Sequence, residues 1–162
     1  MLAFSLLLGN DDILYVVLFS SLHEIGHIIS LYALHGKAKI ITLSYYGIGL
    51  KHNSNLSNLK MIVFLLSGVV VNLFFIAVNI KREINAALFF INILPIYPLD
   101  GGRALKIIID SVFDFKKSLI IFKVITCISI LLLIILAVYL KNLSLVFISL
   151  YIIIYSISNS FE

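Results

Sequence analysis

The sequence is dominated by long apolar runs that are nearly free of charge. Only 12% of the 162 residues are charged and 62% are hydrophobic, whereas ordinary soluble domains are about a quarter charged. A helix needs about 20 apolar residues to cross a hydrocarbon core of about 30 Å. Apolar runs occupy residues 13–34, 61–80, 84–99, 119–140 and 143–157, and residues 2–8 could form part of another helix. We therefore expect a single membrane-embedded, all-α domain (1–162) with four to five transmembrane helices.

The first long run contains the motif His23-Glu24-Ile25-Gly26-His27. On a helix, the two histidines lie one turn apart on one face, so both imidazoles can bind a single metal ion. A zinc ion held by two His and one further ligand keeps a position open for water and lowers the pKa of that water. Glu24 lies beside the pair, where its carboxylate can accept the proton of such a water as general base.

This motif could also arise by chance, and in a soluble helix chance is a substantial alternative. Ionisable side chains at bilayer depth are costly and are by default functional. Three of them within five residues need a shared partner, which a divalent cation supplies. The sequence therefore predicts a metal site at His23 and His27, buried within the membrane.

The run at 84–99 is interrupted near its end, where both prolines of the chain, Pro95 and Pro98, precede Asp100. Proline breaks helical hydrogen bonding, and irregular backbone at membrane depth is tolerated only where it lines a cavity or is buried in protein. We therefore expect this helix to unwind beside a functional site. Besides Glu24, Asp100 is the only carboxylate in a membrane-embedded position, so we assign it as the third metal ligand. The alternative is an Asp that caps a short helix at 104–109.

In the run at 61–80, Ser67, Gly68 and Asn72 place small side chains and one amide at mid-membrane. The simplest interpretation is close helix packing at Ser67 and Gly68, with Asn72 hydrogen-bonded between helices. Together with Asn92 and the unwound stretch, Asn72 could also line a water path to the site.

The connection at 35–60 carries four lysines and no acid, so the positive-inside rule places it in the cytoplasm. With this topology eight basic residues gather on the cytoplasmic side, namely Lys37, Lys39, Lys51, Lys60, Arg103, Lys106, Lys116 and Lys117. We attribute the net charge of +4 to this topology and not to nucleic-acid binding.

Within this connection, residues 40–46 are β-branched and aromatic, and Gly47 and Gly49 follow. This composition favours short strands over a helix, so we expect a membrane-adjacent β-hairpin. Its edge could pair with an unfolded peptide next to the metal site. An ordinary hairpin packed on the helices is an equally good interpretation.

The His23–His27 motif, the Ser67–Asn72 element and the segment from Asn92 to Gly102 resemble, in order and spacing, the site-2 protease family of intramembrane zinc metalloproteases. Within that family, the sporulation-type proteases that process a pro-sigma factor are the most similar. The resemblance implies one Zn²⁺ per chain, held by His23, His27 and Asp100, with Glu24 as the general base. It also places Asn92 near the substrate, and we group Asn72, Pro95 and Pro98 with it as candidate substrate-binding residues.

The resemblance further implies a membrane-tethered protein substrate and a cytoplasmic product, such as a transcription regulator. It implies a bacterial cell membrane protein whose site lies towards the cytoplasmic side, with membrane regulatory proteins as possible partners. Three features depart from the family. Val69 follows Gly68 where many relatives have proline, residues 2–8 stand in for a full first helix, and no nucleotide-sensing or PDZ-like domain is expected. Regulation through such domains therefore does not carry over.

Two other functions are alternatives to the predicted protease activity. A membrane metal transporter could use His23 and His27 as transit ligands, but it gives Glu24 no role. A catalytically inactive relative could bind a partner without cleaving it, although the intact motifs argue against this.

Overall fold

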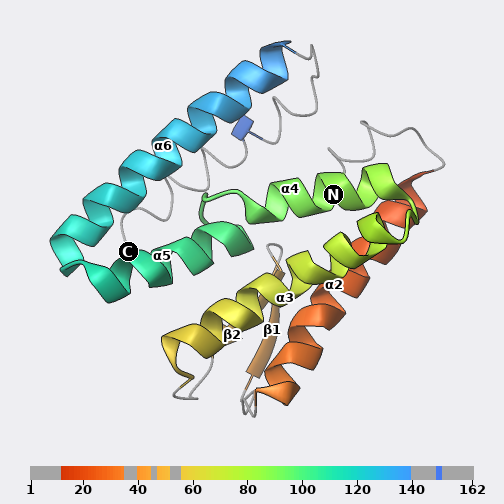
Figure 1. The fold of residues 1–162 in the computed structure, drawn as a ribbon, viewed down its shortest axis with the longest axis horizontal. Helices are drawn as coiled ribbons and strands as arrows, with labels where there is room; N and C mark the ends of the chain where they lie inside the picture. The colour runs from red at the N-terminus through yellow and green to blue at the C-terminus, as the bar shows by residue number, and fades with distance from the viewer. Residues whose placement is uncertain (1–11, 35–39, 45–46, 52–55, 140–148, 151–162) are drawn as a thin grey trace.

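The computed structural model describes residues 12–34, 40–44, 47–51, 56–139 and 149–150 of the chain (Figure 1). These residues form five helices and one antiparallel pair of strands. The elements are α2 (Ile13–Ala33), β1 (Ile40–Ser44), β2 (Gly47–Lys51), α3 (Asn58–Ala77), α4 (Arg82–Ile93), α5 (Asp100–Val112) and α6 (Phe115–Tyr139). The expected partial helix at 2–8 lies outside the described residues. So does the expected span at 143–157, apart from residues 149 and 150.

Three of the described helices, α2, α3 and α6, are long and apolar enough to cross a membrane. Their outer surfaces carry large apolar side chains that are exposed, such as Ile29 on α2, Val70 on α3 and Leu132 on α6. Transfer of such side chains from water to lipid is favourable, so these surfaces suit a membrane. The described residues thus form a largely helical membrane protein with three candidate spans. The four to five spans that the sequence predicted are not confirmed, since most of the predicted span at 143–157 lies outside the described residues.

The second span begins and ends about three residues earlier than the predicted range of 61–80. Ser57 has the extended backbone of an N-cap residue, so α3 begins at Asn58. At the other end, Asn79 and Lys81 both have positive φ angles, which a continuing helix does not allow. The chain turns there and enters α4 in the opposite direction.

The run at 84–99, predicted as a span, is not one continuous helix. α4 has 12 residues and so extends about 18 Å, which is short of the about 30 Å of a hydrocarbon core. It ends at Ile93, because Pro95 and Pro98 cannot continue its hydrogen bonds. Residues 94–99 form tight turns, and α5 begins directly after them. Unwinding at the prolines was expected, whereas the shortness of α4 was not.

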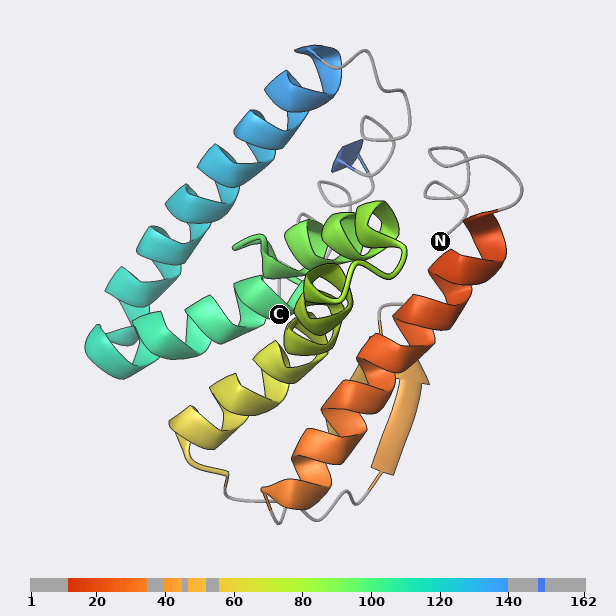
Figure 2. The ribbon, with the colours of Figure 1, turned by 45° about the vertical axis from the view of Figure 1, so that its right-hand side comes forward.

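Helices α2 and α3 lie side by side in both views of the ribbon, with α4 and α5 packed against α3 (Figures 1 and 2). Two buried apolar clusters flank the motif along α2. Val16 and Phe19 pack with residues of α4 on one side of it, and Leu31 packs with residues of α3 and α5 on the other. The face of α2 that carries the histidines is therefore covered by protein, and the histidines do not face lipid.

Candidate metal centre

The helix α2 brings His23 and His27 together, as their spacing of four residues predicts. Both residues are buried, each with 4% of its surface exposed. Their ring centroids lie 4.8 Å apart, and their Nε2 atoms lie 3.1 Å apart. Two ring nitrogens therefore face the same small space.

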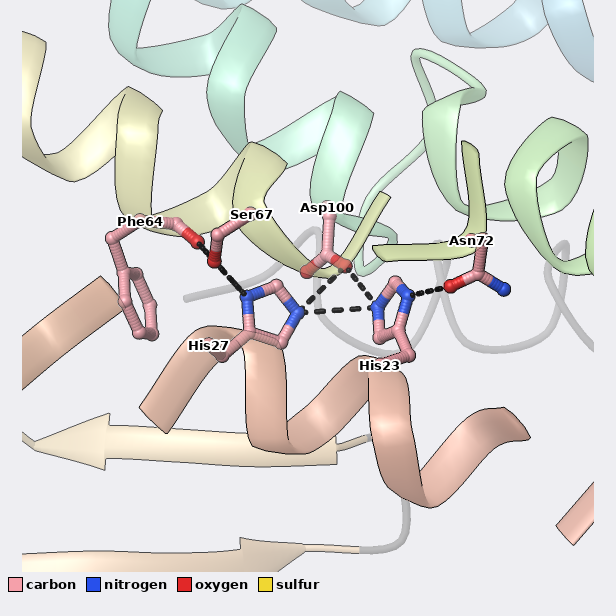
Figure 3. Close-up of polar contacts among 6 residues, drawn as sticks. All are labelled: His23, His27, Phe64, Ser67, Asn72 and Asp100. Atoms are coloured by element: carbon pink, nitrogen blue, oxygen red, sulfur yellow. Dashed lines mark hydrogen bonds and ion pairs between the residues drawn. The ribbon is translucent and has the colours of Figure 1, made fainter. Parts of the chain in front are cut away.

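Asp100 enters this space from the first residue of α5, far away in the sequence. Its Oδ2 atom lies 3.0 Å from Nε2 of His23 and 3.2 Å from Nε2 of His27 (Figure 3). The N-cap position of α5 belongs to Leu99, and the structure gives it no side-chain cap hydrogen bond. The contacts of Asp100 are thus with the two histidines and not those of a helix cap.

The outer nitrogens of both histidines are hydrogen-bonded to α3. Nδ1 of His23 donates to Oδ1 of Asn72 at 2.8 Å, and Nδ1 of His27 donates to the backbone carbonyl of Phe64 at 2.9 Å. Ser67 Oγ donates to the same carbonyl at 2.6 Å. With the protons on Nδ1, both Nε2 atoms carry a lone pair that points at the partner histidine and at Asp100.

This donor set fits a metal ion of the size of zinc. Two imidazole nitrogens and one carboxylate oxygen are ligands found in catalytic zinc sites, with bonds of about 2.0–2.2 Å. Ligand atoms at the corners of a tetrahedron with such bonds lie about 3.3–3.6 Å apart. The three atoms here lie 3.0–3.2 Å from one another. Two lone pairs and an anionic oxygen at these distances repel one another unless a cation or a shared proton lies between them.

Glycines allow α2 and α3 to approach closely at the site. A Cβ atom on Gly26 would lie 2.6 Å from Val71 Cγ2, and a Cβ on Gly68 would lie 2.5 Å from Nε2 of His23 and 2.6 Å from Nε2 of His27. All three distances are too short for a real side chain. The bare Cα of Gly68 therefore forms one wall of the space between the imidazoles.

A second pair of glycines lets α5 begin against the turns that precede it. A Cβ on Gly101 would lie 2.2 Å from the carbonyl oxygen of Ile93, and a Cβ on Gly102 would lie 2.3 Å from the carbonyl carbon of Ile96. The first turn of α5 is thus packed on backbone. This packing fixes where Asp100 enters the site.

Glu24 follows His23 on α2 and is half-buried. Its Oε2 atom is buried and has no hydrogen-bond partner among the residues that the structure describes. An unpartnered carboxylate oxygen inside a membrane helix is costly. Such an oxygen suits a group that bonds to a substrate or to water during a reaction.

The candidate substrate-binding residues lie in two different environments. Asn72 is fully buried and contacts His23. Asn92, Pro95 and Pro98 are half-buried, in the last turn of α4 and in the turns that lead to Asp100. Thr126 of α6 donates to the carbonyl of Pro95 at 3.4 Å, so α6 supports these turns.

Sequence reasoning missed the contacts of the histidines with α3. The carbonyl of Phe64 carries no sequence signal, since every residue has one. A usable signal did exist at Gly68 and Asn72, which lie four and eight residues after Phe64 and therefore on the same face of α3.

Comparison of the chain with protein-family models and with curated proteins found no match. Assignment of function therefore rests on the residues of the site.

Proposed function

We propose that this protein is an intramembrane zinc metalloprotease that cleaves membrane-associated proteins. The observation that carries the proposal is the meeting of His23 and His27 with Asp100, which lies 73 residues after His27, next to Glu24. The Oε2 atom of Glu24 is buried and has no hydrogen-bond partner among the described residues. A metal-binding site alone would need the three ligands but not the Glu.

In this proposal His23, His27 and Asp100 hold one zinc ion through Nε2, Nε2 and Oδ2. Zinc, when bound, would polarise a substrate carbonyl and lower the pKa of water, so that water can lose a proton and attack the carbonyl at neutral pH. Oε2 of Glu24 accepts the proton of the attacking water. It then gives that proton to the amine that leaves when the peptide bond breaks.

The depth of the site supports a substrate that lies in the membrane. His23 lies about 15 Å along α2 from Ile13, and His27 lies about 9 Å from Ala33. A peptide bond in a helix is shielded and hydrogen-bonded internally, so a substrate helix has to unwind before it can react. The half-buried turns at 94–99, together with Asn92, are the surface that we assign to the unwound substrate.

The resemblance to the site-2 proteases supplies the remainder of the proposal. We place the protein in a bacterial cell membrane with its site towards the cytoplasmic side. Its substrate class is a membrane-tethered protein whose cytoplasmic product, such as a sigma factor or another transcription regulator, is released by cleavage. Membrane regulatory proteins are proposed partners.

The test is to compare the wild-type protein with Glu24→Gln and Asp100→Ala in detergent, with Glu83→Gln as the matched control. Glu83 lies in the first turn of α4, outside the site. We measure bound zinc, and cleavage of membrane-tethered pro-proteins that carry a cytoplasmic reporter. We expect about one zinc per chain in the wild type and in Glu24→Gln, none in Asp100→Ala, and cleavage only by the wild type and Glu83→Gln.

Other results would favour the rivals. Zinc binding and zinc uptake into vesicles that persist in Glu24→Gln, with no cleavage by any variant, would indicate a metal transporter. Full zinc content in Asp100→Ala would remove Asp100 from the ligand set.

A further inference from the structure

We infer that Asn72 is a positioning residue of the metal centre, which holds the imidazole of His23 in the tautomer that can bind a metal. The inference rests on the proposed function, because it assigns a role to Asn72 within the same site. Its starting point is the 2.8 Å contact between Oδ1 of Asn72 and Nδ1 of His23 (Figure 3).

The direction of this hydrogen bond decides what His23 can do. A neutral imidazole carries a proton on only one of its two nitrogens. That nitrogen donates a hydrogen bond, and the other has a lone pair that can accept a hydrogen bond or bind a metal. An amide oxygen only accepts, and it therefore keeps the proton of His23 on Nδ1 and leaves the lone pair on Nε2. If the amide had the opposite orientation, Nδ2 of Asn72 would donate to Nδ1 of His23, and the proton of His23 would then be on Nε2. That proton would point into the space shared with His27 and Asp100, and Nε2 could not be a ligand.

The environment of the amide nitrogen, Nδ2, indicates that only the oxygen of Asn72 has a partner in the part of the chain that the structure describes. Asn72 is fully buried, and its Nδ2 has no hydrogen-bond partner among the described residues. Burying an unpaired donor is unfavourable, and a Leu or Val at the same position of an apolar helix would avoid it. The cost is offset only if Oδ1 has a use, and its one partner among the described residues is His23.

A second buried amide shows the contrast. Asn85 of α4 is also almost completely buried, and its Oδ1 has no partner among the described residues. Its Nδ2, however, donates to the carbonyls of Ile80 and Lys81 in the turn between α3 and α4. Its role is therefore to close that turn. Asn85 and Asn72 are two amides of equal size and burial, of which one contacts the metal centre.

The two histidines are held by different kinds of acceptor. His27 is fixed by the backbone carbonyl of Phe64, which a substitution does not remove, whereas His23 depends on the side chain of Asn72. Gly68 lies midway between these acceptors on α3 and lets both rings reach them. Replacement of Asn72 therefore releases one histidine and leaves the other in place.

The experiment uses Asn72→Leu, which removes the acceptor, Asn72→Asp, which keeps it, and Asn85→Leu as the matched control. The ¹⁵N chemical shifts of His23 are recorded on metal-free protein at alkaline pH, where imidazoles are neutral. Zinc affinity is then measured by competition with a chromophoric chelator. We expect the Nδ1–H tautomer in the wild type, Asn72→Asp and Asn85→Leu, and a mixture in Asn72→Leu.

We expect Asn72→Leu to lose about 10- to 100-fold in zinc affinity, as for other residues that orient a metal-binding His. Asn72→Asp and Asn85→Leu should stay within about threefold of the wild type. The inference is overturned if His23 of the wild type carries its proton on Nε2, or if Asn72→Leu keeps both tautomer and affinity. If Asn72→Leu does not fold, a tenfold loss of affinity in Asn72→Asp overturns it. The tautomer is read without metal or substrate, so failure of the proposed protease activity appears separately, in the cleavage assay.

Discussion

Gly68 lies so close to His23 that a single methyl group on its Cα would come within 2.5 Å of the Nε2 atom. The substitution Gly68→Ala is therefore expected to push both imidazoles away from Asp100. We predict a loss of zinc affinity of at least about tenfold and a destabilisation of about 1–3 kcal/mol, as for other overpacked cores. Zinc titration and thermal unfolding in detergent measure the two effects.

The control for Gly68→Ala is Val70→Ala, two residues further along the same helix, where the side chain is 59% exposed on the outer face. It should leave zinc affinity unchanged. Equal zinc affinity in Gly68→Ala and the wild type would show that α3 does not hold the imidazoles as closely as described.

Removal of the metal should destabilise the protein through mass action. A ligand that binds only the folded state at 100 times its Kd adds about 2.7 kcal/mol to the free energy of unfolding. We therefore expect a chelator to lower the Tm of the wild type, and added zinc to restore it. The Tm of His23→Ala and Asp100→Ala should not respond to either. A response in those variants equal to that of the wild type would place the metal elsewhere on the chain.

The start of α5 should be as sensitive to a methyl group as α3 is. In Gly102→Ala the new Cβ would lie 2.3 Å from the backbone of Ile96, which is completely buried. We predict a destabilisation of about 1–3 kcal/mol together with weaker zinc binding, because the first turn of α5 carries Asp100. Ile108→Ala, at an exposed position of the same helix, is the control and should change neither. Normal zinc binding in a destabilised Gly102→Ala would separate the packing of α5 from the position of Asp100.

Asp110, near the end of α5, makes stability depend on pH. Burial acts to raise the pKa of Asp110, but hydrogen bonds from Lys106 and Ser118 and the charge of Lys106 outweigh it, so the pKa lies below its ordinary value of 3.8. A lowered pKa in the folded state stabilises the protein above the unfolded-state pKa, and this contribution is lost as the pH falls through the folded-state value. Because the Asp110 side chain is 44% exposed, we expect less than about 1 kcal/mol.

The measurement is thermal unfolding of wild type and Asp110→Asn in detergent. The variant should have the lower Tm at pH 7, and the difference should shrink as the pH falls below about 4. Asp114→Asn, four residues away, is the control. A Tm difference that is the same at neutral and acid pH would mean that the carboxylate of Asp110 contributes no charge interaction.

Local sequence patterns predicted the parts of the site that depend on local structure. His23 and His27 share a helix face because a helix has a fixed repeat, and the helix at 84–99 ends because proline cannot donate a hydrogen bond. Local patterns could not predict that Asp100 lies next to the histidines, since this depends on how α2 and α5 pack. It was inferred by elimination among the carboxylates and by resemblance, and the structure brings these residues within 3.2 Å.

Other features could not be predicted because their causes lie in packing and in backbone conformation. The ends of α3 depend on the extended backbone of Ser57 and the positive φ angles beyond Ala77. Asn72 was interpreted as a residue between helices or near substrate, because an amide in an apolar run does not reveal which group it contacts. The spacing of Gly68 and Asn72 places both on one face of α3, but it does not indicate that Gly68 lies against both imidazoles.

Because Asp100 is the first residue of α5, the three candidate ligands come together only when α5 packs against the other helices, after α2 has inserted into the membrane. A chain that had inserted α2 and α3 but had not yet docked α5 would offer a metal only two imidazoles. Tight binding would begin when the last ligand arrives. If the site holds a metal as we propose, metal uptake would report helix association in the bilayer. The absorption of bound cobalt would then change from the spectrum of two nitrogen ligands to that of three ligands when α5 packs against α2 and α3.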